Sequence, residues 1–459
     1  MNIPNIQNEY MNQIRESYAV GRRYYIATFG CQMNAHDSEK LAGMLAQMGY
    51  APAAGEKDAD VIVYNTCCVR ENAENKVYGK LGYLKHLKAA KPHLKIALCG
   101  CMMQQDAVLE KLQRVYRHVD VIFGTYNLDR LPQLLHAAYE SGSMIVDVWR
   151  EHGEVAEDLP MVRENPYKAG VNVMYGCNNF CTYCIVPYVR GRERSRKPSD
   201  ILAEAAKAAD GGAKEILLLG QNVNSYGLGL EEKVSFASLL EQVTAVPGVE
   251  RVRFMTPHPK DLSDELIAVV RDNPKACSHI HLPFQSGSTE LLLRMNRKYT
   301  KEDYLRLAFR VQEMIPDVAL TTDIIVGFPG ETEEDFLDTL DVVRQVRFHG
   351  AFTFLYSKRS GTPAAAMENQ VEDAVAKERF NRLLETSNAI VYERNRAQEG
   401  RGVTVLAETY DAAKQVITGR ADDNSIVHCK GDEADLGKLV DVRITEGKPF
   451  YLMGEKVTD

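Results

Sequence analysis

The sequence predicts an α/β protein in three parts: an N-terminal parallel α/β sheet domain, a central partial (β/α)6 barrel and a small C-terminal β-barrel. Three observations support this. Short apolar strand candidates alternate with helical segments over residues 22–140, six more strand–helix units follow over 163–394, and five short strand candidates fill 397–459. A chain of 459 residues is long enough for about three domains.

The composition is that of an ordinary globular protein, with 45% hydrophobic and 26% charged residues. The N-terminus lacks an apolar signal region, and no run reaches the roughly 18 apolar residues of a membrane span. We therefore expect a cytoplasmic protein without a membrane partner. Ten cysteines are too sparse for a secreted disulfide scaffold. The net charge of −8 argues against a general nucleic-acid coat but allows a local basic site.

The N-terminal part begins with a polar extension, residues 1–21, which shows no clear period and is expected to be loosely held. Strand candidates follow, at Tyr24–Thr28, Val61–Tyr64 and Lys95–Leu98. Between the first two, Ser38–Met48 has helical spacing of apolar residues behind a possible Asp37 or Ser38 cap. Strands that alternate with helices indicate a parallel sheet.

One cysteine lies just beyond each of these strands: Cys31, Cys67 and Cys101. Because ligands gather at the carboxyl ends of parallel strands, the three cysteines should converge and hold a metal cluster. The alternative is three unrelated buried cysteines that act as small hydrophobes. Cys67 and Cys68 are adjacent, so in a strand they would point to opposite faces and only one of them could face the site. Cys99 and Cys101 are two residues apart and would share a face, so spacing alone does not show which of these two is the ligand.

The central part begins after a charged, proline-containing linker, residues 150–168. Six strand candidates predict a partial barrel with its active face at the strand carboxyl ends. They are Val171–Tyr175, Glu215–Leu219, Arg251–Met255, His279–Leu282, Leu320–Val326 and Ala351–Leu355. Glycine-containing or polar loops at 217–227, 281–288 and 323–331 follow three of them; each alone is an ordinary turn, but together they indicate a ligand site.

The first of these strands leads through Gly176 into Cys177, Cys181 and Cys184, a C-x3-C-x2-C pattern. Three thiolates within eight residues suit a 4Fe–4S cluster with one iron left open. A structural zinc site would need a fourth ligand, and a disulfide knot does not suit a cytosolic chain. The spacing therefore favours the cluster.

A dense basic run follows this cysteine loop and comprises Arg190, Arg192, Arg194, Arg196 and Lys197. Such runs are often solvated faces, but its place at the barrel mouth favours contacts with nucleic-acid phosphates. Arg359, after the sixth strand, is expected to extend the same surface.

A long helix, Lys377–Gln398, connects to the C-terminal part. The five short strands there predict a small barrel of the oligonucleotide-binding kind. Residues 399–459 hold 12 acidic and 8 basic residues, a net charge of −4. That charge suits RNA poorly and leaves room for a basic protein partner.

These motifs resemble a known family. The C-x3-C-x2-C loop is similar to that of the radical S-adenosylmethionine (SAM) superfamily, in which SAM chelates the open iron. TFGCQMN (28–34), NTCCVREN (65–72) and CGCMMQ (99–104) resemble the N-terminal motifs of the methylthiotransferases, and the last 60 residues resemble their TRAM domain. The resemblance implies two 4Fe–4S clusters, with an auxiliary cluster on Cys31, Cys67 and Cys101 and with Cys68 and Cys99 outside the ligand set. The SAM contacts that it implies are Tyr183, Gly220, Gln221, Ser286 and Gly287.

The implied reaction is methylthiolation, in which a 5′-deoxyadenosyl radical removes hydrogen, the auxiliary cluster supplies sulfur and two SAM molecules are consumed per product. GQNVNSYG (220–227) and TFGCQMN resemble most the branch that modifies carbon 2 of isopentenyl-adenosine beside the anticodon of tRNA. The implied partners are a tRNA anticodon stem-loop, an electron donor such as flavodoxin or ferredoxin, and a sulfur donor.

Two other substrates occur in the family, threonylcarbamoyl-adenosine tRNA and a ribosomal-protein aspartate. A hypothesis of another class is a non-catalytic iron–sulfur or zinc scaffold that binds RNA. The ordered cysteine loop and the polar strand-end loops argue against that scaffold.

Overall fold

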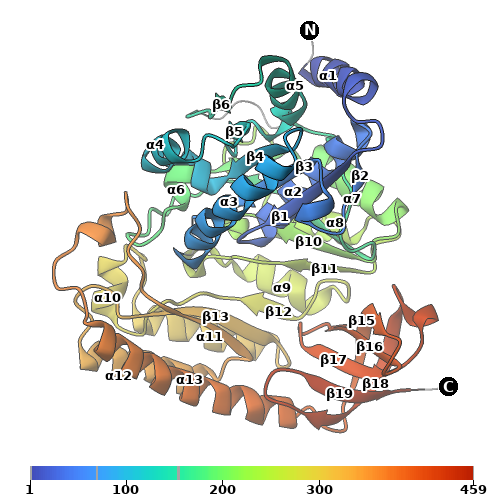
Figure 1. Cartoon of the computed structure of the whole chain (residues 1–459). Helices are drawn as coiled ribbons and strands as arrows, with labels where there is room; N and C mark the ends of the chain where they lie inside the picture. Colours follow the sequence, from blue (N-terminus) through green and yellow to red (C-terminus); the bar gives the residue numbers. More distant parts are fainter. Residues whose placement is uncertain (1–2, 69–70, 152–155, 458–459) are drawn as a thin grey trace. The chain divides into compact units, whose positions relative to one another are not determined.

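The computed structural model describes residues 3–68, 71–151 and 156–457, so part of the predicted linker 150–168 lies outside the described residues. The chain divides into two compact units (Figure 1). Unit 1 comprises Met1–Glu164, Tyr175–Asn178 and Cys184–Glu193. Unit 2 comprises Asn165–Met174, Asn179–Tyr183 and Arg194–Asp459.

Unit 1 is built on a parallel sheet of six strands in the order β2-β1-β3-β4-β5-β6. The strands are β1 Arg23–Thr28, β2 Ala51–Pro52, β3 Val61–Thr66, β4 Lys95–Gly100, β5 Val121–Phe123 and β6 Ile145–Asp147. The helices are α1 Ile3–Ser17, α2 Gln32–Gln47, α3 Glu71–Ala90, α4 Asp106–Val115, α5 Leu131–Ser141 and α6 Val186–Val189. The predicted parallel sheet is confirmed, with three strands more than the sequence indicated.

Alternation along the strands divides the core of unit 1 into two clusters. On β4, Ile96 and Leu98 pack in one cluster, whereas Ala97 and Cys99 pack in the other. Successive side chains of a strand point to opposite faces, so the sheet separates the two clusters. Both faces of the sheet are therefore covered, as parallel sheets require.

The prediction for residues 1–21 was wrong over its described part, because residues 3–17 form helix α1. Met11 and Ile14 are buried in the core, and α1 packs on α5. The same buried face includes the polar Gln7, whose side-chain oxygen accepts a hydrogen bond from the backbone of Gln133 at 3.4 Å. This polar residue interrupts the apolar stripe and hides the helical period from the sequence.

Unit 2 contains six parallel barrel strands that form two three-stranded sheets, β11-β10-β7 and β12-β13-β14. A parallel bridge from Val252 to Ala276 links the β11 side to the segment that leads into β12. The strands are β7 Lys168–Asn172, β10 Glu215–Leu219, β11 Arg251–Phe254, β12 His279–His281, β13 Ala319–Val326 and β14 Gly350–Leu355. Two short strands, β8 Met174–Tyr175 and β9 Arg194–Ser195, pair separately.

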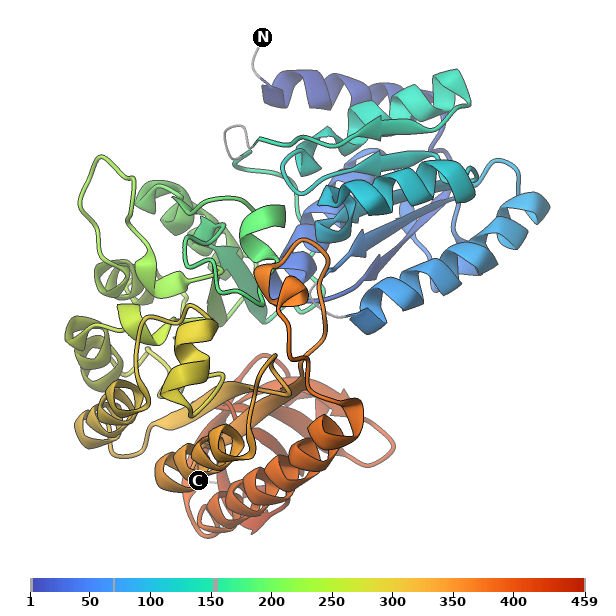
Figure 2. The ribbon, with the colours of Figure 1, turned by 90° about the vertical axis from the view of Figure 1, so that its left-hand side faces the viewer.

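Helices cover the outside of these strands (Figure 2). They are α7 Pro198–Asp210, α8 Phe236–Thr244, α9 Asp264–Asp272, α10 Thr289–Arg294, α11 Lys301–Met314, α12 Glu333–Val346 and α13 Asp373–Arg396. The largest core cluster joins alternate strand residues, such as Ile216 and Val252, to these helices. The predicted partial barrel is confirmed. No helix in the described part of the chain has the length and apolarity to cross a membrane.

The C-terminal strands close into a five-stranded barrel in the order β15-β16-β17-β19-β18. They are β15 Gly402–Asp411, β16 Val416–Ala421, β17 Ile426–Lys430, β18 Leu439–Gly447 and β19 Leu452–Lys456. Alternate residues such as Val440, Val442 and Ile444 fill its core. The small barrel that the sequence predicted is therefore present.

A buried ion network joins the two barrels inside unit 2. Glu215, which is 1% exposed, pairs with Arg251 at 2.9 Å and with Arg253 at 3.5 Å. Arg251 donates to the carbonyl of Arg420 at 2.7 Å, and Arg253 donates to that of Asp422 at 2.9 Å. Burial alone would raise the pKa of Glu215, but Arg253, Lys168 and Arg251 outweigh it and lower the pKa to about 2.

We predict that Glu215→Gln destabilises the protein by about 3 to 5 kcal/mol at neutral pH, because two guanidinium groups lose a buried counter-charge. The folded-state pKa of Glu215 is lowered, so its stabilising effect is complete above its unfolded pKa of about 4.3 and is lost as the pH falls toward about 2. Urea denaturation from pH 7 to pH 3 should therefore show the difference between variant and wild type shrinking below about pH 4.5.

The control is Glu250→Gln, which removes a half-exposed ion pair with Lys214 and should cost no more than about 1 kcal/mol. Equal effects of the two substitutions would contradict the assignment of the network to the joint between the barrels.

Candidate metal-binding cysteine sites

The first candidate site lies at the carboxyl ends of β1, β3 and β4, which are neighbours in the sheet of unit 1. Cys31 precedes α2 as its N-cap, Cys67 follows β3, and Cys101 opens a 3-10 turn directly after β4. Helix α2 begins at Gln32, six residues before the predicted start, and neither Asp37 nor Ser38 is its cap. Parallel pairing thus brings together the three loops as the sequence predicted.

Close contacts join these loops. A Cβ added at Gly30, where φ is +109°, would overlap the Cβ and Sγ of Cys67. Asn34 donates to the carbonyls of Phe29 and Thr66 at 2.8 and 2.9 Å. Cys101 interacts electrostatically with Cys31. The three cysteine loops are therefore neighbours at this edge of the sheet.

Arg190 completes this site from a distant part of the sequence. It is 4% exposed, and its Nε donates to the sulfur of Cys101 at 3.2 Å. Its Nη2 donates to Asn34 at 2.6 Å and to Asp37 at 3.0 Å. The sequence placed Arg190 among phosphate contacts; that assignment was wrong, because the guanidinium points inward to the cysteine site.

The two additional cysteines take different positions. Cys99 is fully buried on the α1 and α5 side of the sheet, away from Cys101. The separation arises at Gly100, whose φ of +93° ends the alternation that would have put Cys99 and Cys101 on one face. Cys68 instead contacts Cys101 directly: its hydrogen bond and the charge of Arg190 lower the pKa of the Cys101 thiol against the opposing effect of burial.

The second candidate site is the Cys177–Cys184 loop. A Cβ at Gly176, where φ is +77°, would overlap the carbonyl oxygens of Gly191 and Arg192, so only glycine fits. The amide of Cys177 donates to the carbonyl of Gly191 at 3.1 Å. Glycine thus allows the following chain to pass close beside the first cysteine.

Within unit 2, Cys181 and Tyr183 lie beside the buried Arg297. Nη1 of Arg297 is 3.6 Å from the sulfur of Cys181 and 3.4 Å from the hydroxyl of Tyr183. The spacing of the cysteines did not indicate this arginine, which lies more than 100 residues further along the chain.

The predicted SAM contacts differ in their surroundings. Gly220 follows β10, where an added Cβ would lie 2.6 Å from Met174, and Gln221 is half-buried. Ser286 and Gly287 are buried against α12, where the amide of Gly287 donates to Thr339 at 2.9 Å. Ser286 and Gly287 thus have packing contacts with α12, and their contact with SAM stays a prediction.

Other strand-end residues carry features that the sequence did not reveal. Thr256, after β11, and Gln285, after β12, have φ of +64° and +69°. Such conformations are unusual for non-glycine residues and concentrate at functional sites. Burial, Arg297 and Lys260 lower the pKa of the nearby His258 to about 2, so its ring is neutral. In the described part of the chain, Nε2 of His258 has no hydrogen-bond partner.

The basic run does not form one continuous surface. Arg192 and Lys197 are exposed, whereas Arg194 is half-buried. Arg196 is 4% exposed and pairs with Glu204 at 2.7 Å. Arg359 is half-buried after β14. Arg192 is therefore the arginine of the run best placed for a phosphate contact.

The chemistry of the donors fits iron–sulfur clusters. Each cysteine set has one sulfur within hydrogen-bond distance of a buried guanidinium: Cys101 beside Arg190 and Cys181 beside Arg297. Cysteine sulfur is the usual ligand of such clusters. Over residues 3–68, 71–151 and 156–457, no three His, Cys, Asp or Glu side chains stand close enough to hold a metal ion already. The agreement with iron–sulfur clusters therefore depends on the type of donor, cysteine sulfur, and on the positions of the cysteines in the fold.

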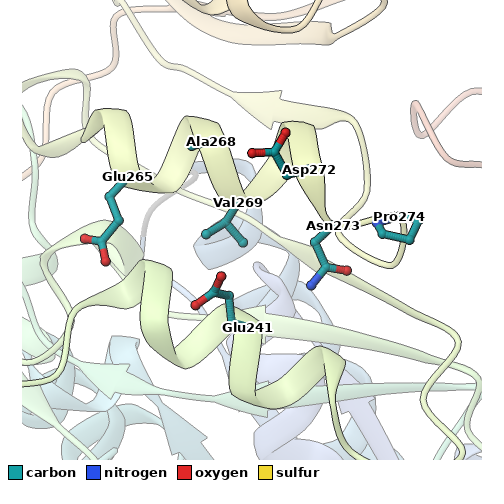
Figure 3. Close-up of a pocket in the computed structure, with 7 residues that line it drawn as sticks. All are labelled: Glu241, Glu265, Ala268, Val269, Asp272, Asn273 and Pro274. Atoms are coloured by element: carbon teal, nitrogen blue, oxygen red, sulfur yellow. The ribbon is translucent and has the colours of Figure 1, made fainter.

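A hollow of about 520 Å³ lies between α8 and α9 (Figure 3). Its lining includes three carboxylates, Glu241, Glu265 and Asp272, and no cysteine. An acidic surface hollow of this kind shows no sign of a specific ligand.

Family models match three parts of the chain. The radical SAM superfamily matches residues 171–343, the uncharacterized protein family UPF0004 matches 23–124, and the TRAM domain matches 396–457. The fold and the cysteine sites thus define a radical SAM protein with a TRAM domain.

Whole-chain comparisons identify the family more closely. A protein of Lachnoclostridium phytofermentans is 56% identical over 95% of this chain and 96% of its own length, and one of Acetivibrio thermocellus is 56% identical over 98% and 96%. Both are named tRNA-2-methylthio-N(6)-dimethylallyladenosine synthase. The chain belongs to the family of tRNA-2-methylthio-N(6)-dimethylallyladenosine synthases.

A solved structure supports the fold alone. The radical SAM methyltransferase TsrM of Kitasatospora setae, solved with tryptophan and a SAM analogue, is 14% identical, has a TM-score of 0.53 and covers 75% of each chain. At this identity the likeness concerns architecture and not substrate.

We predict that Gly100→Ala removes the auxiliary cluster, because its Cβ would overlap the carbonyl of Thr66 and its φ of +93° strains any other residue. Anaerobically reconstituted variant should hold about four irons per chain, whereas the wild type should hold about eight. Gly79→Ala is the matched control, because a Cβ there meets no atom within 4 Å. It should keep all iron and gain up to about 1 kcal/mol of stability. Full iron in Gly100→Ala would contradict the predicted site.

Proposed function

We propose that this protein is a radical SAM methylthiotransferase that adds a methylthio group to carbon 2 of isopentenyl-adenosine beside the anticodon of tRNA. The observation that carries the proposal is identity above 50%, over nearly the whole chain, to relatives with that name. The cofactors of the family are SAM and 4Fe–4S clusters. Both cysteine sets on which such clusters depend are present, one at the ends of adjacent strands and one after β7 and β8.

In this proposal Cys177, Cys181 and Cys184 hold the cluster that binds SAM, and Cys31, Cys67 and Cys101 hold the auxiliary cluster. When bound, the clusters and SAM supply a 5′-deoxyadenosyl radical and the sulfur that is transferred. The proposal keeps the domain limits 22–140, 163–394 and 397–459. It also keeps the predicted SAM contacts, which are Tyr183, Gly220, Gln221, Ser286 and Gly287.

The protein's own residues position and shield these groups. Cys67 and Cys101 are 2% and 5% exposed, so the fold excludes water from most of the auxiliary site. Arg190 ties the sulfur of Cys101 to Asn34 and Asp37 at the start of α2, which fixes the first and third cysteine loops relative to each other. Hydrogen bonds to a ligand sulfur orient it and tune the bound metal.

A tRNA substrate agrees with the family name and with the TRAM domain. The modified base lies in a single-stranded loop, where a protein can extrude it into a pocket. We propose Arg192, Arg194 and Arg359 as phosphate contacts. An electron donor such as flavodoxin or ferredoxin, a sulfur donor and a cytoplasmic location complete the proposal.

The decisive experiment is mass spectrometry of tRNA nucleosides from a strain that lacks the gene. Methylthio-isopentenyl-adenosine should be absent, isopentenyl-adenosine should accumulate, and the wild-type gene should restore the product. Genes with Cys177→Ala or Cys67→Ala should not restore it, whereas Cys99→Ala should, because Cys99 faces the other side of the sheet. An unchanged nucleoside profile in the deletion strain would refute the proposed substrate.

We predict that Arg192→Gln weakens tRNA binding and lowers the slope of log affinity against log salt by about 0.7 to 0.9, the value of one phosphate contact. The control is Arg306→Gln, which changes an arginine with a 75% exposed side chain on α11. Binding should be measured by fluorescence anisotropy with an isopentenyl-adenosine anticodon stem-loop at several salt concentrations. Equal slopes for the wild type and Arg192→Gln would assign this arginine to a solvated surface.

A further inference from the structure

Six arginines are buried in the described part of the chain, and five of them have a carboxylate within 4 Å. These five pairs are Arg190–Asp37, Arg196–Glu204, Arg251–Glu215, Arg253–Glu215 and Arg379–Glu331. Arg297 is the sixth, and it forms no ion pair with any described carboxylate. A buried guanidinium that lacks an anion is an exception that requires a cause.

Neutral groups surround Arg297 and hold it in one orientation. Its Nη2 donates to the carbonyl of Pro283 at 2.7 Å, and its Nε donates to the hydroxyl of Tyr299 at 2.9 Å. Its Nη1 is directed to the hydroxyl of Tyr183 and to the sulfur of Cys181. Of these neighbours, Cys181 belongs to the cysteine set assigned to a cluster, and its sulfur lies 3.6 Å from Nη1.

The free-energy cost of burying the charge of Arg297 favours an anion beside it. A buried charge without a counter-charge costs several kcal/mol, more than neutral hydrogen bonds recover. Arg297 is nevertheless only 4% exposed. Two of its three guanidinium nitrogens donate hydrogen bonds, one to a backbone carbonyl and one to Tyr299. The third nitrogen, Nη1, is directed to the sulfur of Cys181 and to the hydroxyl of Tyr183.

We propose that Arg297 is the counter-charge of the iron–sulfur cluster that Cys181 helps to hold, and that it raises the reduction potential of that cluster. The inference rests on the proposed function, which assigns Cys177, Cys181 and Cys184 to this cluster. A cluster with thiolate ligands becomes more negative on reduction, so a fixed positive charge and a hydrogen bond to sulfur stabilise the reduced state. Arg297 is thus a positioning residue for the cluster.

The test uses the full chain with Cys31→Ala, Cys67→Ala and Cys101→Ala as its parent, so that only one cluster is reconstituted. Potentiometric titration followed by electron paramagnetic resonance, without SAM, measures the midpoint potential. Arg297→Met should shift the midpoint to more negative values and lower the iron retained on gel filtration. Arg297→Lys keeps the positive charge but loses the planar guanidinium group, so its shift in midpoint potential should be smaller than that of Arg297→Met.

Two further variants control this comparison. Tyr299→Phe removes one orienting hydrogen bond and keeps the charge, so it should give a small shift in the same direction even if Arg297→Met does not fold. Arg190→Met changes the buried arginine beside the other cysteine set and should leave the midpoint of the parent unchanged.

Unchanged potential and iron content in Arg297→Met and Tyr299→Phe would overturn the inference. The SAM carboxylate is the other anion that a guanidinium could hold. A Kd for SAM raised at least tenfold in Arg297→Met, with an unchanged midpoint, would assign the charge to the cofactor and refute its role toward the cluster. If the parent itself binds no 4Fe–4S cluster, the proposed function fails first, and this inference fails with it.

Discussion

Parallel strand pairing is the constraint from which the candidate chemistry follows. In a parallel sheet every carboxyl end lies at one edge, so residues some 35 positions apart in the sequence become neighbours. In unit 1 this places Cys31, Cys67 and Cys101 after adjacent strands. In unit 2 the same rule places the loops after β10 and β11 at one edge of their sheet, and the loops after β12 and β13 at one edge of theirs. The glycines at 30, 100 and 176 then let the chain turn where a Cβ would overlap a neighbour.

Each cysteine set is accompanied by one buried arginine, but the two arginines are balanced differently. Arg190 is compensated by Asp37, so its charge is tolerated when no cluster is bound. Arg297 has no such carboxylate among the described residues, so its charge depends on an anion that arrives. This difference suggests that the two sites respond differently to cluster loss, with the Arg190 site retaining its structure better.

The sequence predicted the sheet, the partial barrel and the C-terminal barrel because the spacing of apolar residues and the positions of the strand ends can be recognised from short stretches of sequence. The family resemblance supplied the choice of Cys67 and Cys101, for which the structure adds a reason at Gly100. Helix α1 and the start of α2 were missed because their buried faces include polar residues such as Gln7 and Asn34. The inward direction of Arg190 depends on a contact with Cys101, 89 positions away, and the position of Arg297 depends on a contact with Cys181, 116 positions away. No local pattern encodes contacts at such separations.

The account as a whole predicts a fixed stoichiometry. Reconstituted protein, SAM, a reductant and isopentenyl-adenosine tRNA should yield equal amounts of 5′-deoxyadenosine, S-adenosylhomocysteine and methylthiolated nucleoside when all three are quantified in one anaerobic reaction. Equal amounts would mean that one SAM supplies the radical and another supplies the methyl group. Methylthiolated nucleoside formed without 5′-deoxyadenosine, or 5′-deoxyadenosine formed while the nucleoside stays unmodified, would contradict the account.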